Sequence, residues 1–117
     1  MKSLRGKTAL ITGGSSGIGL AIARALAREG MNLVLAARTQ EPLERAASEL
    51  QSAGTRVLTL PTDVTDFEQL QSLVDAAHQE FGSIEVLVNN AGVESHRDFH
   101  QLSIHEIEQT VQVNLLA

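Results

Sequence analysis

The fold of this chain is decided by residues 8–19, whose sequence is TALITGGSSGIG. Residues 8–12 form a continuous β-prone run ended by Gly13-Gly14, which is typical of a strand buried on both faces of a parallel sheet. After Gly19, apolar residues recur at helical spacing up to Gly30, a residue that suits a C-terminal cap. The stretch therefore predicts a strand, a glycine-rich loop and a helix, in that order.

The glycine-rich loop, residues 13–19, suits a phosphate ligand. Glycine lets the backbone turn sharply and approach a ligand without an intervening Cβ. The N-terminus of a helix adds free N–H groups and a positive dipole end. A P-loop is excluded because Leu20-Ala21 stand where Lys and Ser or Thr are required, and the G-x-G-x-x-G fingerprint fails at Ile22. The remaining pattern is T-G-x-x-x-G-x-G, with a ligand-free turn as the alternative.

The rest of the chain alternates between predicted strands and helices. Further strands are expected at residues 33–37, 56–60 and 84–88. The helices between them are expected from Pro42 to near Gly54, and from the capping box Thr65-x-x-Glu68 to Gly82. This alternation predicts a doubly wound, three-layer α/β/α sheet of the Rossmann type, with about four parallel strands.

A last helix is predicted to open at a second capping box, Ser103-x-x-Glu106, and it is still apolar at residues 115–117. It has no Gly, Pro or basic end signal, so we expect the chain to stop inside this helix. Residues 1–117 are then the N-terminal part of a single dinucleotide-binding Rossmann domain, truncated within its last helix.

Three further motifs follow the glycine loop in order, and these are Asp63-Val64, Asn89-Asn90-Ala91-Gly92 and Val113-Asn114-Leu115. With the loop, they resemble the short-chain dehydrogenase/reductase family over essentially the whole chain. The resemblance implies an oxidoreductase that transfers hydride between a nicotinamide cofactor and a small-molecule carbonyl or alcohol. It implies that Asp63 and Val64 contact adenine, and that a helical Asn114 supports a proton-relay water as the catalytic residue. The cofactor-binding residues that it implies are Gly13, Ser15, Ser16, Gly17, Ile18, Gly19, Asp63, Val64, Asn90, Ala91 and Gly92.

The end of the second strand bears on the choice of cofactor. An acid there would accept the ribose 2′-OH of NAD, whereas an Arg accommodates the 2′-phosphate of NADP. Here the strand ends at Ala37 and is followed by Arg38, and no carboxylate occurs before Glu41. The sequence therefore favours NADP over NAD, with Arg38 as a further cofactor-binding residue.

Turnover in this family implies a tyrosine acid/base, a lysine four residues later and a substrate-orienting serine. The chain contains no Tyr, and its lysines, Lys2 and Lys7, precede the glycine loop. Neither the phenol nor the cation that would lower its pKa from about 10 is present, so we expect these residues alone to be inactive. The alternative is a non-catalytic NADP-binding module, or a subunit completed by a partner chain.

Composition excludes several other classes of function. The net charge of −5 and the lack of a basic cluster argue against nucleic acid, and no apolar run is long enough for a membrane span. The absence of Cys favours a reducing cytoplasm. No metal site is expected, because the candidate histidines lack a further ligand at fixed spacing; they are His96, His100 and His105. The oligomeric state stays open, a homo-oligomer included.

Overall fold

The computed structural model describes residues 3–15, 17–90 and 112–115. The elements, in chain order, are β1 (Thr8–Thr12), α1 (Gly17–Arg28), β2 (Asn32–Ala37), α2 (Gln40–Ser52), β3 (Val57–Pro61), α3 (Phe67–Phe81), β4 (Val86–Asn89) and β5 (Gln112–Leu115). The strands form one sheet in the order β3-β2-β1-β4-β5, in which β1 to β4 are parallel and β5 is antiparallel. The predicted Rossmann-type sheet with four parallel strands is confirmed.

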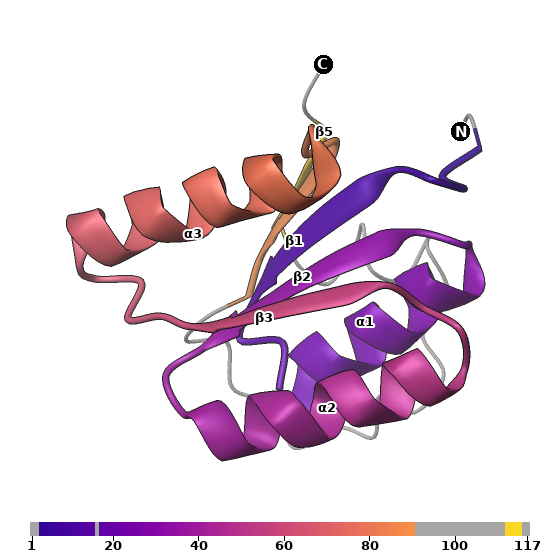
Figure 1. Cartoon of the computed structure of the whole chain (residues 1–117), viewed down its shortest axis with the longest axis horizontal. Coiled ribbons are helices and arrows are strands. Elements are labelled where there is room, and N and C mark those ends of the chain that lie inside the picture. Colours follow the sequence, from indigo (N-terminus) through magenta and orange to yellow (C-terminus); the bar gives the residue numbers. More distant parts are fainter. Residues whose placement is uncertain (1–2, 16, 91–111, 116–117) are drawn as a thin grey trace.

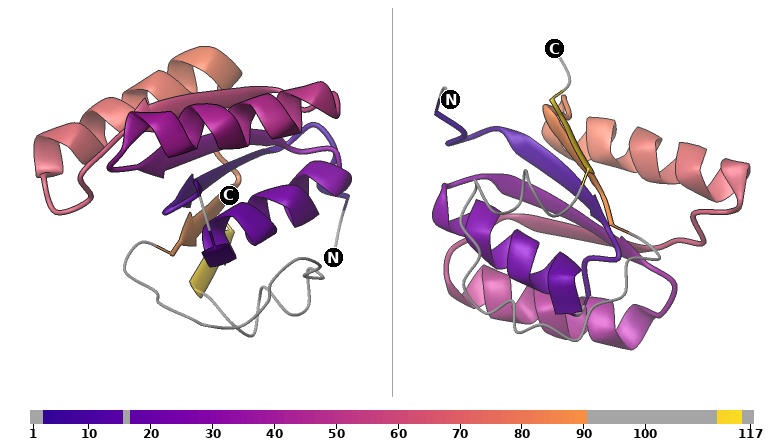
Figure 2. Two further views of the ribbon diagram at one scale, coloured as in Figure 1. Left: turned by 90° about the horizontal axis from the view of Figure 1, so that it is seen from below. Right: turned by 180° about the vertical axis from the view of Figure 1, so that it is seen from behind.

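Helices cover both faces of this sheet. The helices α1 and α2 lie against one face and α3 lies against the other (Figures 1 and 2). Successive residues of the central strand point to opposite layers: Ala9 and Ile11 pack in the core under α1 and α2, whereas Leu10 packs under α3. All residues of β1 are buried, as the apolar run predicts.

Two helices begin earlier than predicted. The helix α1 begins at Gly17 and α2 begins at Gln40. Their predicted start signals, Gly19 and Pro42, fall inside the first turn, where helix sequences tolerate residues that would break a helix interior. The predicted strands lie within two residues of the observed ones.

The predicted capping box at Thr65 is wrong, because Asp66 is the N-cap of α3. One oxygen of its carboxylate accepts hydrogen bonds from the N–H groups of Glu68, at 3.0 Å, and Gln69, at 3.3 Å. Asp is at least as good an N-cap as Thr, so the local sequence alone does not show which of the two residues caps the helix. The Thr65 hydroxyl instead donates to Asp63 Oδ1 at 2.7 Å.

The last predicted helix is wrong at residues 112–115, which form β5 at the edge of the sheet beside β4 (Figure 2). Pairing with β4 satisfies the backbone N–H and C=O groups that an open strand edge would leave unpaired. A short apolar run of this kind fits a strand as well as a buried helix, so periodicity alone does not decide. The capping box Ser103-x-x-Glu106 lies outside the described residues.

Candidate cofactor-binding site

The candidate site lies at the carboxyl ends of β1 and β4, where the order of the parallel strands reverses. Strand β1 pairs with β2 on one side and with β4 on the other. The chain that leaves β1 runs through α1 to β2, whereas β4 lies on the other side of β1. Ligands of open α/β sheets bind at such a switch point. The glycine loop and the Asn89-Asn90 pair meet there.

The glycine loop is packed closely against the start of α1. Gly13 and Gly17 have φ values of 65° and 56°, a region that L side chains rarely adopt. A Cβ on Gly19 would lie 1.7 Å from the Gly13 carbonyl oxygen and 2.8 Å from Asn90 Nδ2. A side chain at position 19 therefore has no room, because the Gly13 carbonyl and Asn90 fill the space.

Two side chains connect the glycine loop to β4. The backbone N–H of Asn90 donates to Thr12 Oγ1 at 2.9 Å, and Asn90 Nδ2 donates to the Gly13 carbonyl oxygen at 3.2 Å. Asn90 is 5% exposed, and its Oδ1 is buried without a hydrogen-bond partner among the described residues. The sequence analysis named Asn90 as an implied cofactor-binding residue but did not predict its hydrogen bond to the Gly13 carbonyl oxygen. It also missed the link through Thr12, although both residues lie in the motifs.

The N-terminus of α1 fits an anion. Its first turn carries no acidic residue, so none of its own carboxylates neutralises the positive dipole end. Ile18 is buried beneath this turn, and Ser15 is half-buried in the loop before it. Ser16 lies outside the described residues. The described residues therefore suit the pyrophosphate that the sequence predicts.

A second group of predicted residues lies at the ends of β2 and β3. Arg38 Nη2 is 3.7 Å from Asp63 Oδ1, and Val64, the residue after Asp63, is half-buried. The same Asp63 oxygen accepts hydrogen bonds from Thr65 Oγ1, at 2.7 Å, and from the Thr65 N–H, at 3.0 Å. These bonds, and then the charge of Arg38, hold the pKa of the Asp63 carboxyl below its ordinary value. Asp63 is thus an anion in a fixed position.

Asn114 is not set in a helix as predicted. Its Cα pairs with that of Leu87 within the sheet, whereas the carboxyl end of β4 pairs through Asn89 and Gln112. The structure therefore does not bring Asn114 to the end of β4 beside Asn90. Ala91 and Gly92 lie outside the described residues.

Neither a metal cluster nor a membrane-spanning helix occurs in the part of the chain that the structure describes. No group of three or more His, Cys, Asp or Glu side chains among these residues could hold a metal ion. No helix in the same ranges is both long enough and apolar enough to cross a bilayer.

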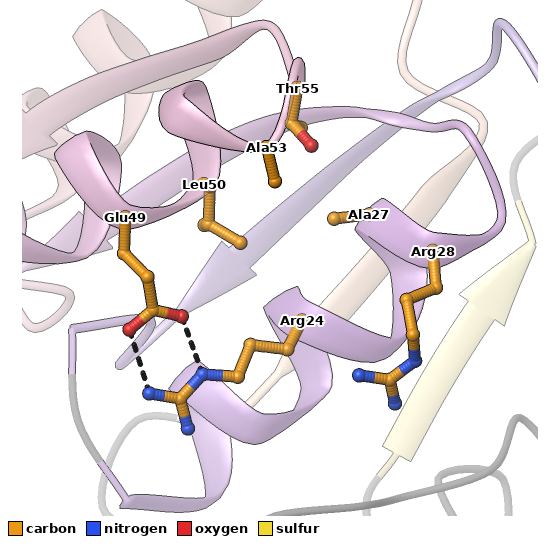
Figure 3. A pocket seen from close by; sticks show the side chains of 7 residues that line it. All are labelled: Arg24, Ala27, Arg28, Glu49, Leu50, Ala53 and Thr55. Carbon is orange, nitrogen blue, oxygen red and sulfur yellow. Dashed lines mark hydrogen bonds and ion pairs between the residues drawn. The ribbon is translucent and has the colours of Figure 1, made fainter.

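A separate hollow of ≈ 350 Å³ lies between the last turns of α1 and α2 (Figure 3). Arg24 Nε and Nη2 donate to the two Glu49 carboxylate oxygens at 2.6 Å and 2.8 Å, and Leu50 lines the hollow beside them. The hydrogen bonds from Arg24 lower the pKa of Glu49. Because these charges satisfy each other, and because the last turns lie away from the glycine loop, this hollow is not part of the candidate site.

Comparisons with known proteins agree with this geometry. Ketoacyl reductase HetN of Nostoc sp. is 42% identical over 117 residues, which are 100% of this chain and 41% of that protein. The crystal structure of L-sorbose reductase from Gluconobacter frateurii, complexed with NADPH and L-sorbose, superposes with a TM-score of 0.76 at 41% identity. That match covers 89% of this chain and 40% of the reductase.

A second solved structure binds the other nicotinamide cofactor. It is a short chain dehydrogenase/reductase from Burkholderia phymatum in complex with NAD, with a TM-score of 0.73 at 42% identity. The match covers 74% of this chain and 31% of that protein. The chain thus spans about two fifths or less of the length of these relatives. Residues 7–117 match the short chain dehydrogenase family, and this chain belongs to it.

Proposed function

We propose that this chain is the dinucleotide-binding part of an oxidoreductase that transfers hydride between a nicotinamide cofactor and a small-molecule carbonyl or alcohol, with NADP preferred over NAD. One observation carries the proposal. Gly19 packs against the Gly13 carbonyl oxygen, and Asn90 donates a hydrogen bond to the same oxygen at the switch point of the sheet, next to a helix N-terminus without an acid. The relatives that bind NADPH and NAD support a cofactor of this class.

Each part of the dinucleotide has candidate partners on this chain. The backbone of residues 13–19 would hold the pyrophosphate through N–H groups. Asp63 and Val64 would hold the adenine, and residues 90–92 would line the adenine ribose. Arg38 would hold a 2′-phosphate, because a guanidinium makes charge-assisted hydrogen bonds to phosphate oxygens. The bound dinucleotide supplies the hydride donor or acceptor, and this chain supplies its position and an anion-stabilising backbone.

The proton chemistry requires groups that residues 1–117 do not supply. With no Tyr in the sequence, and with Lys2 and Lys7 before the glycine loop, these residues offer no phenol-lysine pair. We therefore expect them to bind cofactor without turnover. The role of Asn114 in a proton relay and a cytoplasmic location stay predictions.

The first test is a titration of the chain with NADPH and NADH, followed by the fluorescence of the cofactor. Because the protein has no Trp or Tyr, its own emission does not interfere. Ser15→Glu places a carboxylate in the loop and should weaken the binding of both cofactors by about fivefold or more, since like charges a few ångströms apart cost roughly 1 kcal/mol even in water. Ser72→Glu adds the same charge to the exposed surface of α3 and should leave both affinities unchanged.

Arg38→Ala tests the cofactor preference in the same assay. Loss of a hydrogen bond to a charged group costs about 1.5–3 kcal/mol. The variant should therefore weaken NADPH by about tenfold or more and leave NADH nearly unchanged. Wild-type protein that binds neither cofactor, or Ser15→Glu protein that binds both normally, would overturn the proposed function. An unchanged NADPH to NADH ratio in Arg38→Ala would overturn the NADP preference alone.

A further inference from the structure

The sheet register brings Arg38 and Asp63 together. Ala37 pairs with Pro61 at the last position of the β2–β3 ladder, and the Thr62 N–H donates to the Ala37 carbonyl oxygen at 2.7 Å. Arg38 follows Ala37 directly, and Asp63 comes two residues after Pro61. Their side chains form an ion pair with 3.7 Å between Arg38 Nη2 and Asp63 Oδ1. Because backbone bonds fix both starting points, this pairing follows from the fold.

The two partners of this ion pair differ in freedom. Asp63 Oδ1 accepts two hydrogen bonds from Thr65, and the Asp63 N–H donates to Gln69 Oε1 at 2.8 Å. The Arg38 side chain is 74% exposed, and Asp63 is its only partner among the described residues. The carboxylate is thus held in place, while the guanidinium can turn to another anion.

We propose that Asp63 is an internal competitor for Arg38 that reduces the protein's discrimination between NADPH and NADH. The proposal rests on the proposed function above. The 2′-phosphate is the only chemical difference between the two cofactors, and Arg38 is its expected partner. To bind the 2′-phosphate, the Arg38 guanidinium must either break its ion pair with Asp63 Oδ1 or divide its interactions between the two anions. Asp63 is therefore a specificity-determining residue.

Asp63→Asn tests this idea, because it removes the charge and keeps an amide oxygen in place of the carboxylate oxygen. Any loss of an adenine contact affects NADPH and NADH equally and cancels in the ratio of their dissociation constants. An exposed ion pair contributes about 0.2–1 kcal/mol, so the preference for NADPH should rise by about 1.5- to fivefold. The rise should shrink at high salt, because the pair is exposed. Glu41→Gln is the control, since it removes an exposed charge that pairs with Arg45 instead.

A double-mutant cycle separates competition from simple repulsion. If Asp63 acts by holding Arg38, Asp63→Asn should change the NADPH to NADH ratio little in an Arg38→Ala background. The proposal is overturned if the ratio stays the same or falls in Asp63→Asn, or if its rise persists undiminished without Arg38. A wild-type chain that binds neither cofactor would instead show that the proposed function is wrong. Far-UV circular dichroism checks that each variant is folded.

Discussion

Replacement of Gly19 by Ala should loosen the glycine loop through a steric clash with a calculable size. The new Cβ would lie 1.7 Å from the Gly13 carbonyl oxygen, whereas real Cβ atoms essentially never approach closer than 3.0 Å. The helix and the loop must therefore separate by about 1.3 Å, the difference between these distances. The contact of 2.8 Å with Asn90 Nδ2 gives no room on that side.

The free-energy change combines three effects. Overpacking costs about 1–3 kcal/mol, and loss of the Asn90 hydrogen bond to Gly13 costs about 0.5–1.5 kcal/mol. Against these, Ala is about 1 kcal/mol better than Gly inside a helix. We expect a net loss of about 1–3 kcal/mol in the free energy of unfolding. NADPH affinity should fall by about tenfold or more, because the displaced backbone N–H groups no longer have the geometry to donate hydrogen bonds to the pyrophosphate.

Urea unfolding followed by far-UV circular dichroism measures the first change, and NADPH fluorescence measures the second. With an m-value of about 2 kcal/mol/M, the midpoint should fall by about 0.5–1.5 M. Gly54→Ala is the control. Its Cβ meets nothing within 4 Å, but its φ of +93° should cost about 1–2 kcal/mol by strain alone. That variant should lose similar stability and keep NADPH binding. Gly19→Ala protein that is more stable than wild type, as helix propensity alone predicts, would show that the steric clash does not govern this position.

Two further predictions concern the ends of elements. Burial opposes the charge of Glu85, but hydrogen bonds from Ser83 Oγ and the Thr8 N–H outweigh it and lower its pKa. Because its pKa is lowered on folding, Glu85 stabilises the fold at pH values above its ordinary pKa of 4.5, and this stabilisation is lost as the pH falls below that value. Glu85→Gln should therefore lower the free energy of unfolding at pH 7 and change it little near pH 3. An equal cost at both pH values, in urea unfolding, would contradict this account. Asp66→Ala should lower the free energy of unfolding by about 1 kcal/mol through loss of the N-cap. Thr65→Val, which tests the predicted capping box, should leave the helix cap intact, and a larger loss there than in Asp66→Ala would restore Thr65 as the cap.

Local sequence was sufficient wherever one physical preference dominated. The run at residues 8–12 is β-prone throughout and is buried as β1. The glycine pattern predicted a tight turn before a helix, and the positive φ values of Gly13 and Gly17 explain why glycine stands there. The alternation of strands and helices predicted the order of the parallel sheet's layers.

Local sequence failed where two residues offer similar chemistry or where a partner lies far along the chain. Thr65 and Asp66 are both good caps, and in the structure Asp66 caps the helix while the Thr65 hydroxyl donates to Asp63. Residues 112–115 were expected to be helical, but pairing with β4 makes them a strand. The link between Asn90 and Gly13 spans 77 residues and has no periodic signal.

The amino-acid sequence was enough to specify the type of each long element, the position of the glycine loop and the family, because these depend on periodicity, on glycine's freedom and on ordered motifs. Only the tertiary structure decided which of these elements and motifs contact one another. The β1–β4 pairing places Asn90 against the glycine loop, and the β2–β3 register places Asp63 against Arg38. Both contacts arise from parallel strands joined by crossover helices, which align residues distant in sequence at one edge of the sheet.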